Sequence, residues 1–85
     1  MGRKPVARPL PKVLRIPFSS DLDGLASKRR NMILLADTLS PFTLLETTVH
    51  EALHLADWKA SERKVTARAR YIARILWKQG YRISK

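Results

Sequence analysis

The stretch that decides the fold is PFTLLETTVHEALHLA, residues 41–56. Its apolar residues recur at the spacing of a helix with one buried face. The stripe consists of Phe42, Leu45, Val49, Ala52 and Ala56. Ser40 is a candidate N-cap, and Pro41 suits the first helical position. We therefore predict a helix from about Pro41 to about Ala56.

The same segment carries both histidines of the chain, His50 and His54, with Glu51 directly after the first. Residues four apart lie on one face of a helix, so both imidazoles can reach one zinc ion at about 2 Å. Glu51 points about 100° away, where its carboxylate can reach a water bound to the metal. This H-E-x-x-H pattern indicates a hydrolytic site, in which zinc activates a water, Glu51 is the general base, and the water attacks a peptide carbonyl.

The alternative is an ordinary solvated helix face that holds two histidines and a glutamate. With this composition the pattern arises by chance about once in a thousand placements, which favours the metal site. The longer metzincin form of the motif is excluded, because Asp57 and Ala60 occupy its glycine and last histidine positions.

Two ligands do not make a tight site, and the chain has no further histidine and no cysteine. The third ligand must therefore be a carboxylate. Asp57 follows His54 closely on the same helix, whereas Glu62 begins the next predicted helix. We prefer Glu62, because a ligand from a separate element has more freedom to complete a tetrahedron, and Asp57 remains the alternative.

Two strands are expected before the motif. Residues 13–18, VLRIPF, alternate between apolar and other residues, and Pro17 places this strand at an edge or at its end. Residues 32–38, MILLADT, are nearly continuous in apolar residues, as in a strand covered on both faces. Residues 19–31 are predicted to form a loop, either wholly irregular or with a short turn of helix. Its DLDG fragment is not a calcium loop, because the required glycine and glutamate positions hold Ala26 and Met32.

A second helix is expected after the motif. Ser61 can cap it, Glu62 suits its first turn, and Gly80 can end it. Its apolar stripe consists of Val65, Ala69, Ile72, Ala73 and Leu76. Tyr81 and Ile83 are then expected to pack back onto the domain. Trp58 and Trp77 are interpreted as residues that pack in the core or at its rim, in preference to residues that stack on a substrate.

The 85-residue length allows one small domain. We predict an α+β fold with a basic, proline-rich flexible arm at residues 1–12 and the folded domain at residues 13–85. No apolar run is long enough to span a membrane, and the N-terminus lacks the apolar region of a secretory signal. A cytoplasmic location is therefore expected, in the host cell if a phage encodes the protein.

The net charge of +10 favours acidic partners, of which DNA or RNA is the first candidate. The candidate nucleic-acid contacts are Arg3, Lys4, Arg8, Arg70, Arg74 and Lys78. The plainer interpretation is that these side chains only form a solvated surface.

The strand MILLADTL, the helix LLETTVHEALHLADW and the segment SERKVTARARYIARILWKQGYR resemble small zincin-like metallopeptidases of phages and bacteria. These proteins belong broadly with the ImmA/IrrE and SprT-like metallopeptidases. The similarity covers roughly residues 13–82, and HEALH is its most specific part.

The resemblance implies a minimal zincin-like core, with a small sheet of two or three strands packed on two helices. It implies zinc bound by His50, His54 and Glu62, with Glu51 as the catalytic base. It also implies that an extended peptide pairs with the sheet edge nearest the site, which would be at residues 32–38.

Three functions are consistent with these features of the sequence. The leading hypothesis is a zinc metallopeptidase, or a peptidase-like protein, that acts on a protein or peptide substrate. Tyr71, Tyr81 and Arg74 are candidate donors to its developing oxyanion. The second hypothesis is a basic nucleic-acid-binding module, and the third is a zinc site that only stabilises a small domain.

Overall fold

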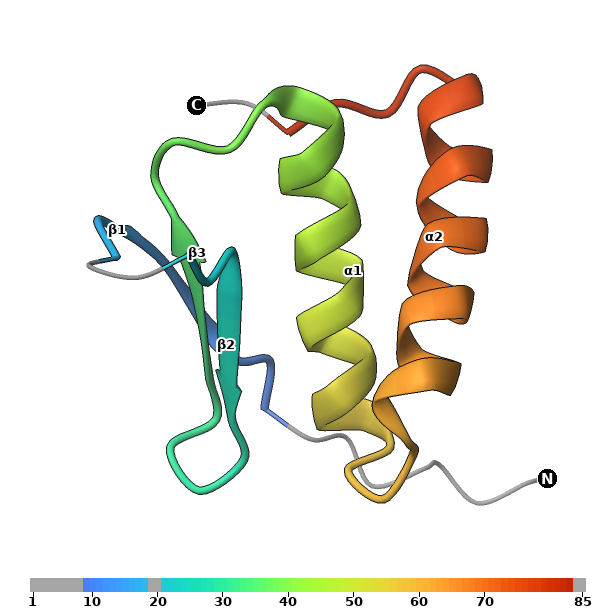
Figure 1. Cartoon of the computed structure of the whole chain (residues 1–85). Helices are drawn as coiled ribbons and strands as arrows, with labels where there is room; N and C mark the ends of the chain where they lie inside the picture. Colours follow the sequence, from blue (N-terminus) through green and yellow to red (C-terminus); the bar gives the residue numbers. More distant parts are fainter. Residues whose placement is uncertain (1–8, 19–20, 84–85) are drawn as a thin grey trace, which may run out of the picture.

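The computed structural model describes residues 9–18 and 21–83. Its elements are β1 (Lys12–Ile16), β2 (Gly24–Ser27), β3 (Met32–Ala36), α1 (Pro41–Ala56) and α2 (Glu62–Lys78). Helix α1 lies between the three-stranded sheet and α2, so the molecule has three layers (Figure 1). The predicted α+β class is confirmed. None of the helices in the described part is long and apolar enough to cross a membrane.

The sheet has the strand order β1-β3-β2, with β1 parallel and β2 antiparallel to the central strand β3. Residues 13–18 and 32–38 do contain strands, as predicted. The loop predicted for residues 19–31 is wrong in part, because β2 lies there. A turn at residues 28–31 joins β2 to β3, and Asn31 adopts a φ of 51° there. Asparagine tolerates this left-handed conformation better than most residues.

The main core lies between β3 and α1. Ile33 and Leu35 from β3 are almost fully buried against Leu44 and Leu55 from α1. The predicted apolar stripe of α1 is therefore partly wrong: Leu45 is buried, but Ala52 and Ala56 are exposed. The helix is covered on two opposite sides, by the sheet and by α2, so a single stripe does not describe its buried surface.

Helix α2 packs on α1 through small side chains. Val65, Ala69 and Ala73 are buried at this contact, as the predicted stripe required, and Ile72 and Leu76 are half-buried. Ala69 and Ala73 have no exposed surface, because the absence of long side chains brings the two helix backbones close together.

Gly80 ends α2 as predicted, with a φ of 90°. The Gly80 amide donates to the Trp77 carbonyl and the Tyr81 amide donates to the Leu76 carbonyl, each at 3.0 Å. This is the Schellman arrangement. Ile83 then packs against the core, but Tyr81 is 61% exposed, so only the first of the two predicted contacts forms.

Candidate metal centre

Three side-chain donors from two helices meet at one point. His50 Nε2 lies 3.2 Å from His54 Nε2, and both face Glu62 across the junction of α1 and α2. Glu62 Oε1 lies 3.1 Å from His50 Nε2 and 2.6 Å from His54 Nε2. The two imidazoles are thus one helical turn apart on α1, and the carboxylate is contributed by the first residue of α2.

These separations can be compared with the needs of a metal ion. Zinc bonds of 2.0–2.1 Å in a tetrahedron place neighbouring donor atoms about 3.3 Å apart. The distances from His50 to the other two donors are close to that value, while the 2.6 Å distance is that of a short hydrogen bond. A bound ion would therefore need only a small outward movement of the exposed Glu62 side chain. Two imidazoles and one carboxylate are a donor set that suits zinc.

The connection between the helices explains why Glu62, and not Asp57, meets the histidines. The Ala60 amide donates to the Asp57 carbonyl, which closes a tight turn after α1. Ser61 then caps α2, because its Oγ accepts from the Lys64 amide at 3.2 Å. Asp57 points elsewhere, and its carboxylate lies 3.8 Å from Arg68. Of the two carboxylates considered from the sequence, the structure brings only Glu62 to the site.

Glu51 is buried beside the three donors, with 8% of its surface exposed. Burial raises the pKa of the Glu51 carboxyl, and the charges of His50 and His54 oppose part of that rise. The pKa of the Glu62 carboxyl shifts in the opposite direction. Partial desolvation raises the pKa of Glu62, but hydrogen bonds with His54 and His50 outweigh this effect and hold the pKa below its ordinary value.

Gly24 of β2 makes room for Glu51. A Cβ atom at this position would lie 2.7 Å from Thr47 Cγ2 and 3.1 Å from Glu51 Cγ. Real Cβ atoms essentially never approach another heavy atom as closely as the first distance. The missing side chain therefore lets α1 approach β2 and holds the Glu51 carboxylate next to the strand.

A cleft runs along the site between β2 and the start of α2. The cleft contains two hollows, and both are lined by His50, Glu51 and Glu62. Leu22 and Gly24 line both as well, Thr66 and Arg70 line one, and Leu25 and Trp58 line the other. The sheet edge at this cleft is β2. The edge expected at residues 32–38 is wrong, because β3 is the central strand and is paired on both sides.

The candidate oxyanion donors do not line the cleft. Tyr71 and Tyr81 are 69% and 61% exposed, and Arg74 is also exposed. Arg70 lines the cleft instead, and its Nε donates to Glu46 Oε2 at 3.3 Å. Sequence reasoning missed this pair, although Glu46 lies four residues before His50 and thus close to its face of the helix.

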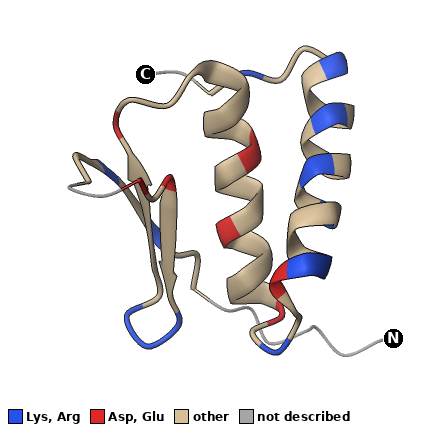
Figure 2. Cartoon of the chain, viewed as in Figure 1, with Lys and Arg blue, Asp and Glu red and all other residues tan. Residues whose placement is uncertain are grey.

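Two of the other candidate nucleic-acid contacts, Arg74 and Lys78, do not line the cleft. Arg74 and Lys78 are exposed on α2, whose basic residues follow its length in Figure 2. Arg3, Lys4 and Arg8 lie outside the described residues.

The two tryptophans have different surroundings. Trp77 packs edge-on against Phe42 at 5.3 Å between ring centroids, as expected. Trp58 is 46% exposed and lines the cleft, which fits packing at a rim and not in the core.

Comparisons with known proteins give no assignment. No family model, curated protein or solved structure matches this chain. The donors, the buried carboxylate and the cleft are therefore the observations that bear on function.

Proposed function

We propose that this protein is a zinc-dependent peptidase or a close peptidase-like relative. The observation that carries the proposal is the meeting of His50, His54 and Glu62 within 3.2 Å of one another, beside the buried carboxylate of Glu51. When bound, zinc supplies a Lewis acid that polarises a carbonyl and makes water more acidic.

The residues of the chain have separate roles in this proposal. The two imidazoles and the Glu62 carboxylate hold the ion. Glu51 accepts a proton from the attacking water and later returns it to the leaving amine. Its raised pKa suits this role, because a base works best when its pKa is near the working pH.

The cleft suits an extended peptide. Among residues 9–18 and 21–83, β3 is the one strand that pairs with β2, so the other edge of β2 presents backbone amides and carbonyls next to the donors. A peptide can add to such an edge as a further strand. Leu25 is 47% exposed on β2 and lines the cleft, which offers an apolar contact to a substrate side chain.

A purely structural zinc site uses the same three donors, but one observation favours catalysis. The Glu62 side chain is 69% exposed, so the donor set is open to solvent on one side. Structural sites are closed by four protein ligands, whereas catalytic sites keep one position for water.

Hydrolysis of fluorescein-labelled casein by the zinc-loaded protein tests the proposal. Glu51→Gln removes the base and leaves the three donors, so we expect activity to fall at least a hundredfold while zinc is retained. Asp57→Asn is the matched control, since Asp57 lies outside the donor set, and its activity should equal that of the wild type. Zinc-loaded wild-type protein with no hydrolysis, or a fully active Glu51→Gln variant, would contradict the proposal.

A further inference from the structure

Six basic residues from three separate segments gather at one end of the molecule. The β2–β3 turn contributes three, the α1–α2 connection one and the first turn of α2 two (Figures 1 and 2). This surface, called here the basic end, consists of Lys28, Arg29, Arg30, Lys59, Arg63 and Lys64, all of them exposed.

The basic end has little compensating negative charge. The acidic residues near it are Asp57, which pairs with Arg68, and Glu62, which pairs with the two histidines. Within residues 9–18 and 21–83, none of the six basic side chains forms an ion pair. Asp21, Asp23 and Asp37 line a hollow beside the start of β2 and the end of β3. Figure 2 shows acidic segments at this end of the sheet, opposite the β2–β3 turn. The charge of the molecule is thus unevenly distributed along its length.

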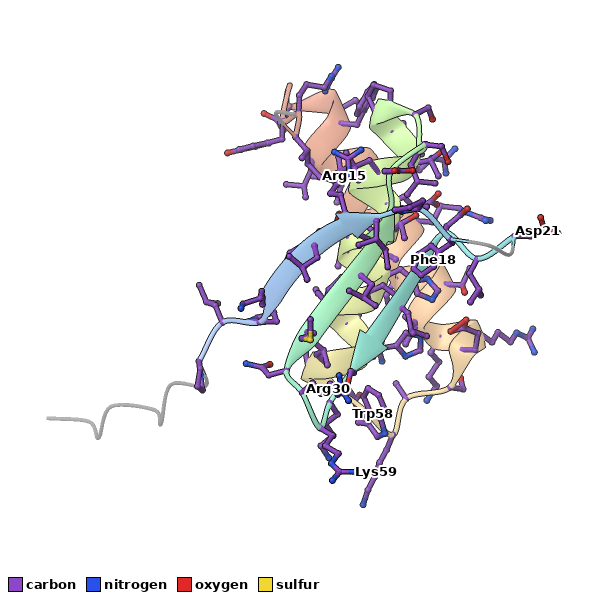
Figure 3. All side chains as sticks on the ribbon, turned by 90° about the vertical axis from the view of Figure 1, so that its left-hand side faces the viewer. Arg15, Phe18, Asp21, Arg30, Trp58 and Lys59 are labelled. Carbon is purple, nitrogen blue, oxygen red and sulfur yellow. The ribbon has the colours of Figure 1, made fainter. Side chains whose placement is uncertain are left out.

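An exposed aromatic ring lies within this surface. Trp58 is 46% exposed, and Figure 3 shows it at the same end as Arg30 and Lys59. Its side chain also lines the cleft together with His54 and Ala60. An accessible indole at the same end as several cations matches the needs of a single-stranded nucleic acid, whose phosphates bind cations and whose bases stack on aromatic rings. An acidic peptide would use the cations but would leave the indole without a stacking partner.

We propose that the basic end binds single-stranded nucleic acid, with phosphates on the six basic side chains and a base stacked on Trp58. This places the contact surface at the turn and the interhelical connection, instead of on the outer side of α2 where Arg74 and Lys78 lie. The proposal uses no property of bound zinc, so it stands or falls separately from the peptidase activity.

Binding of a fluorescently labelled fifteen-nucleotide oligo(dT), followed by anisotropy over a range of salt concentrations, tests the inference. Arg29→Gln/Arg30→Gln removes two charges from the basic end, and Arg74→Gln/Lys78→Gln removes two from α2. We expect the first pair to weaken binding more than tenfold and to lower the slope of log K against log salt by about 1.4. The second pair should weaken binding less than threefold.

The stacking contact needs its own variants. Trp58→Ala should weaken oligo(dT) binding roughly tenfold, and Trp58→Phe should retain most of the affinity, because base stacking tolerates any aromatic ring. Thermal melting by circular dichroism checks that both variants are folded. If the two variants bind equally well, or as well as the wild type, no base stacks on Trp58.

Three other results would overturn the inference. Equal losses in the two double variants would mean that only net charge matters, and a larger loss in Arg74→Gln/Lys78→Gln would place the contact on α2. Binding of polyglutamate or of phosphatidylserine vesicles with the affinity of oligo(dT) would show that the surface is not selective for nucleic acid. Glu51→Gln should bind oligo(dT) like the wild type, which separates this result from a failed peptidase assay.

Discussion

At the scale of single residues, Glu51 is the one charged side chain that is buried in the described structure. It is 8% exposed, lies against Gly24 and Thr47, and has two imidazoles and a second carboxylate nearby. An ionised carboxylate in such a place is disfavoured by the loss of water around it. The proposed role of Glu51 as a base for water at the metal would explain this burial, because burial keeps the carboxylate directed into the cleft.

The pH dependence of stability tests this environment in metal-free protein. Burial raises the pKa of folded Glu51 above its unfolded value of about 4.3. The folded state then binds the proton more tightly, so its stability falls as pH rises from the unfolded pKa through the folded one. Glu51→Gln removes this loss. The gain in melting temperature over the wild type should therefore be larger at pH 7 than at pH 4.

The contribution of Glu62 to the pH dependence of stability has the opposite sign. Its pKa is lowered on folding, so its stabilising effect is present above the unfolded pKa and is lost as pH falls through the folded one. Because Glu62 is the same in both proteins, its effect largely cancels in the comparison. An equal gain for Glu51→Gln at both pH values would contradict the environment described for Glu51.

Gly24 gives a second test at this scale. Gly24→Ala places a methyl group 2.7 Å from Thr47 Cγ2, so we expect a loss of about 1–3 kcal/mol in the free energy of unfolding. Thr47→Ser removes the methyl group that is too close, and the double variant should recover part of the loss. Urea unfolding of the four proteins in this cycle measures the effect. An unchanged urea midpoint for Gly24→Ala would show that β2 and α1 are not in close contact.

At the scale of elements, both helices were predictable and β2 was not. α1 and α2 combine helical periodicity with local start or stop signals, such as Pro41, Ser61 and Gly80. β2 has four residues, GLAS, and its sequence has no clear alternation. It forms because it pairs with β3 and lies against α1, and these tertiary contacts cannot be read from the segment itself.

The two helix starts differ in how their serines act. Ser61 Oγ accepts from the Lys64 amide. The side chain of Ser40, the predicted cap of α1, accepts no such hydrogen bond, and its hydroxyl donates to Thr43 Oγ1. Ser61→Ala should therefore cost about 1 kcal/mol of stability, and Ser40→Ala clearly less. Thermal melting of the two variants measures this. Equal losses would mean that the hydroxyl of Ser61 does not cap α2.

At the scale of the whole molecule, a chain of 85 residues has a small core and depends strongly on added interactions. Zinc that binds only the folded state should stabilise it by about 2.7 kcal/mol at a concentration one hundred times the dissociation constant. For a domain of this size that corresponds to a rise of roughly 10–20 °C in melting temperature. Removal of zinc by a chelator should reverse the rise in the wild type and have no effect on His54→Ala.

The donor set of the site was predictable from the sequence, both in its local part on α1 and in the preference for Glu62 from α2. The spacing of His50 and His54 on one helix fixes their relative positions, and exclusion of other residue types pointed to a carboxylate. The position of Trp58 at the cleft and the gathering of residues 28–30 with Lys59 depend on how β2 and the α1–α2 connection are placed in space. No periodicity in the sequence carries that information.

The central claim is that His50, His54 and Glu62 hold one metal ion. The most direct test is the zinc content of purified protein by mass spectrometry, for the wild type, Glu51→Gln, Asp57→Asn and Glu62→Gln. We expect one zinc per chain in the first three, and a marked loss in Glu62→Gln. A wild type without stoichiometric zinc, or a Glu62→Gln variant that retains it while Asp57→Asn does not, would contradict this assignment.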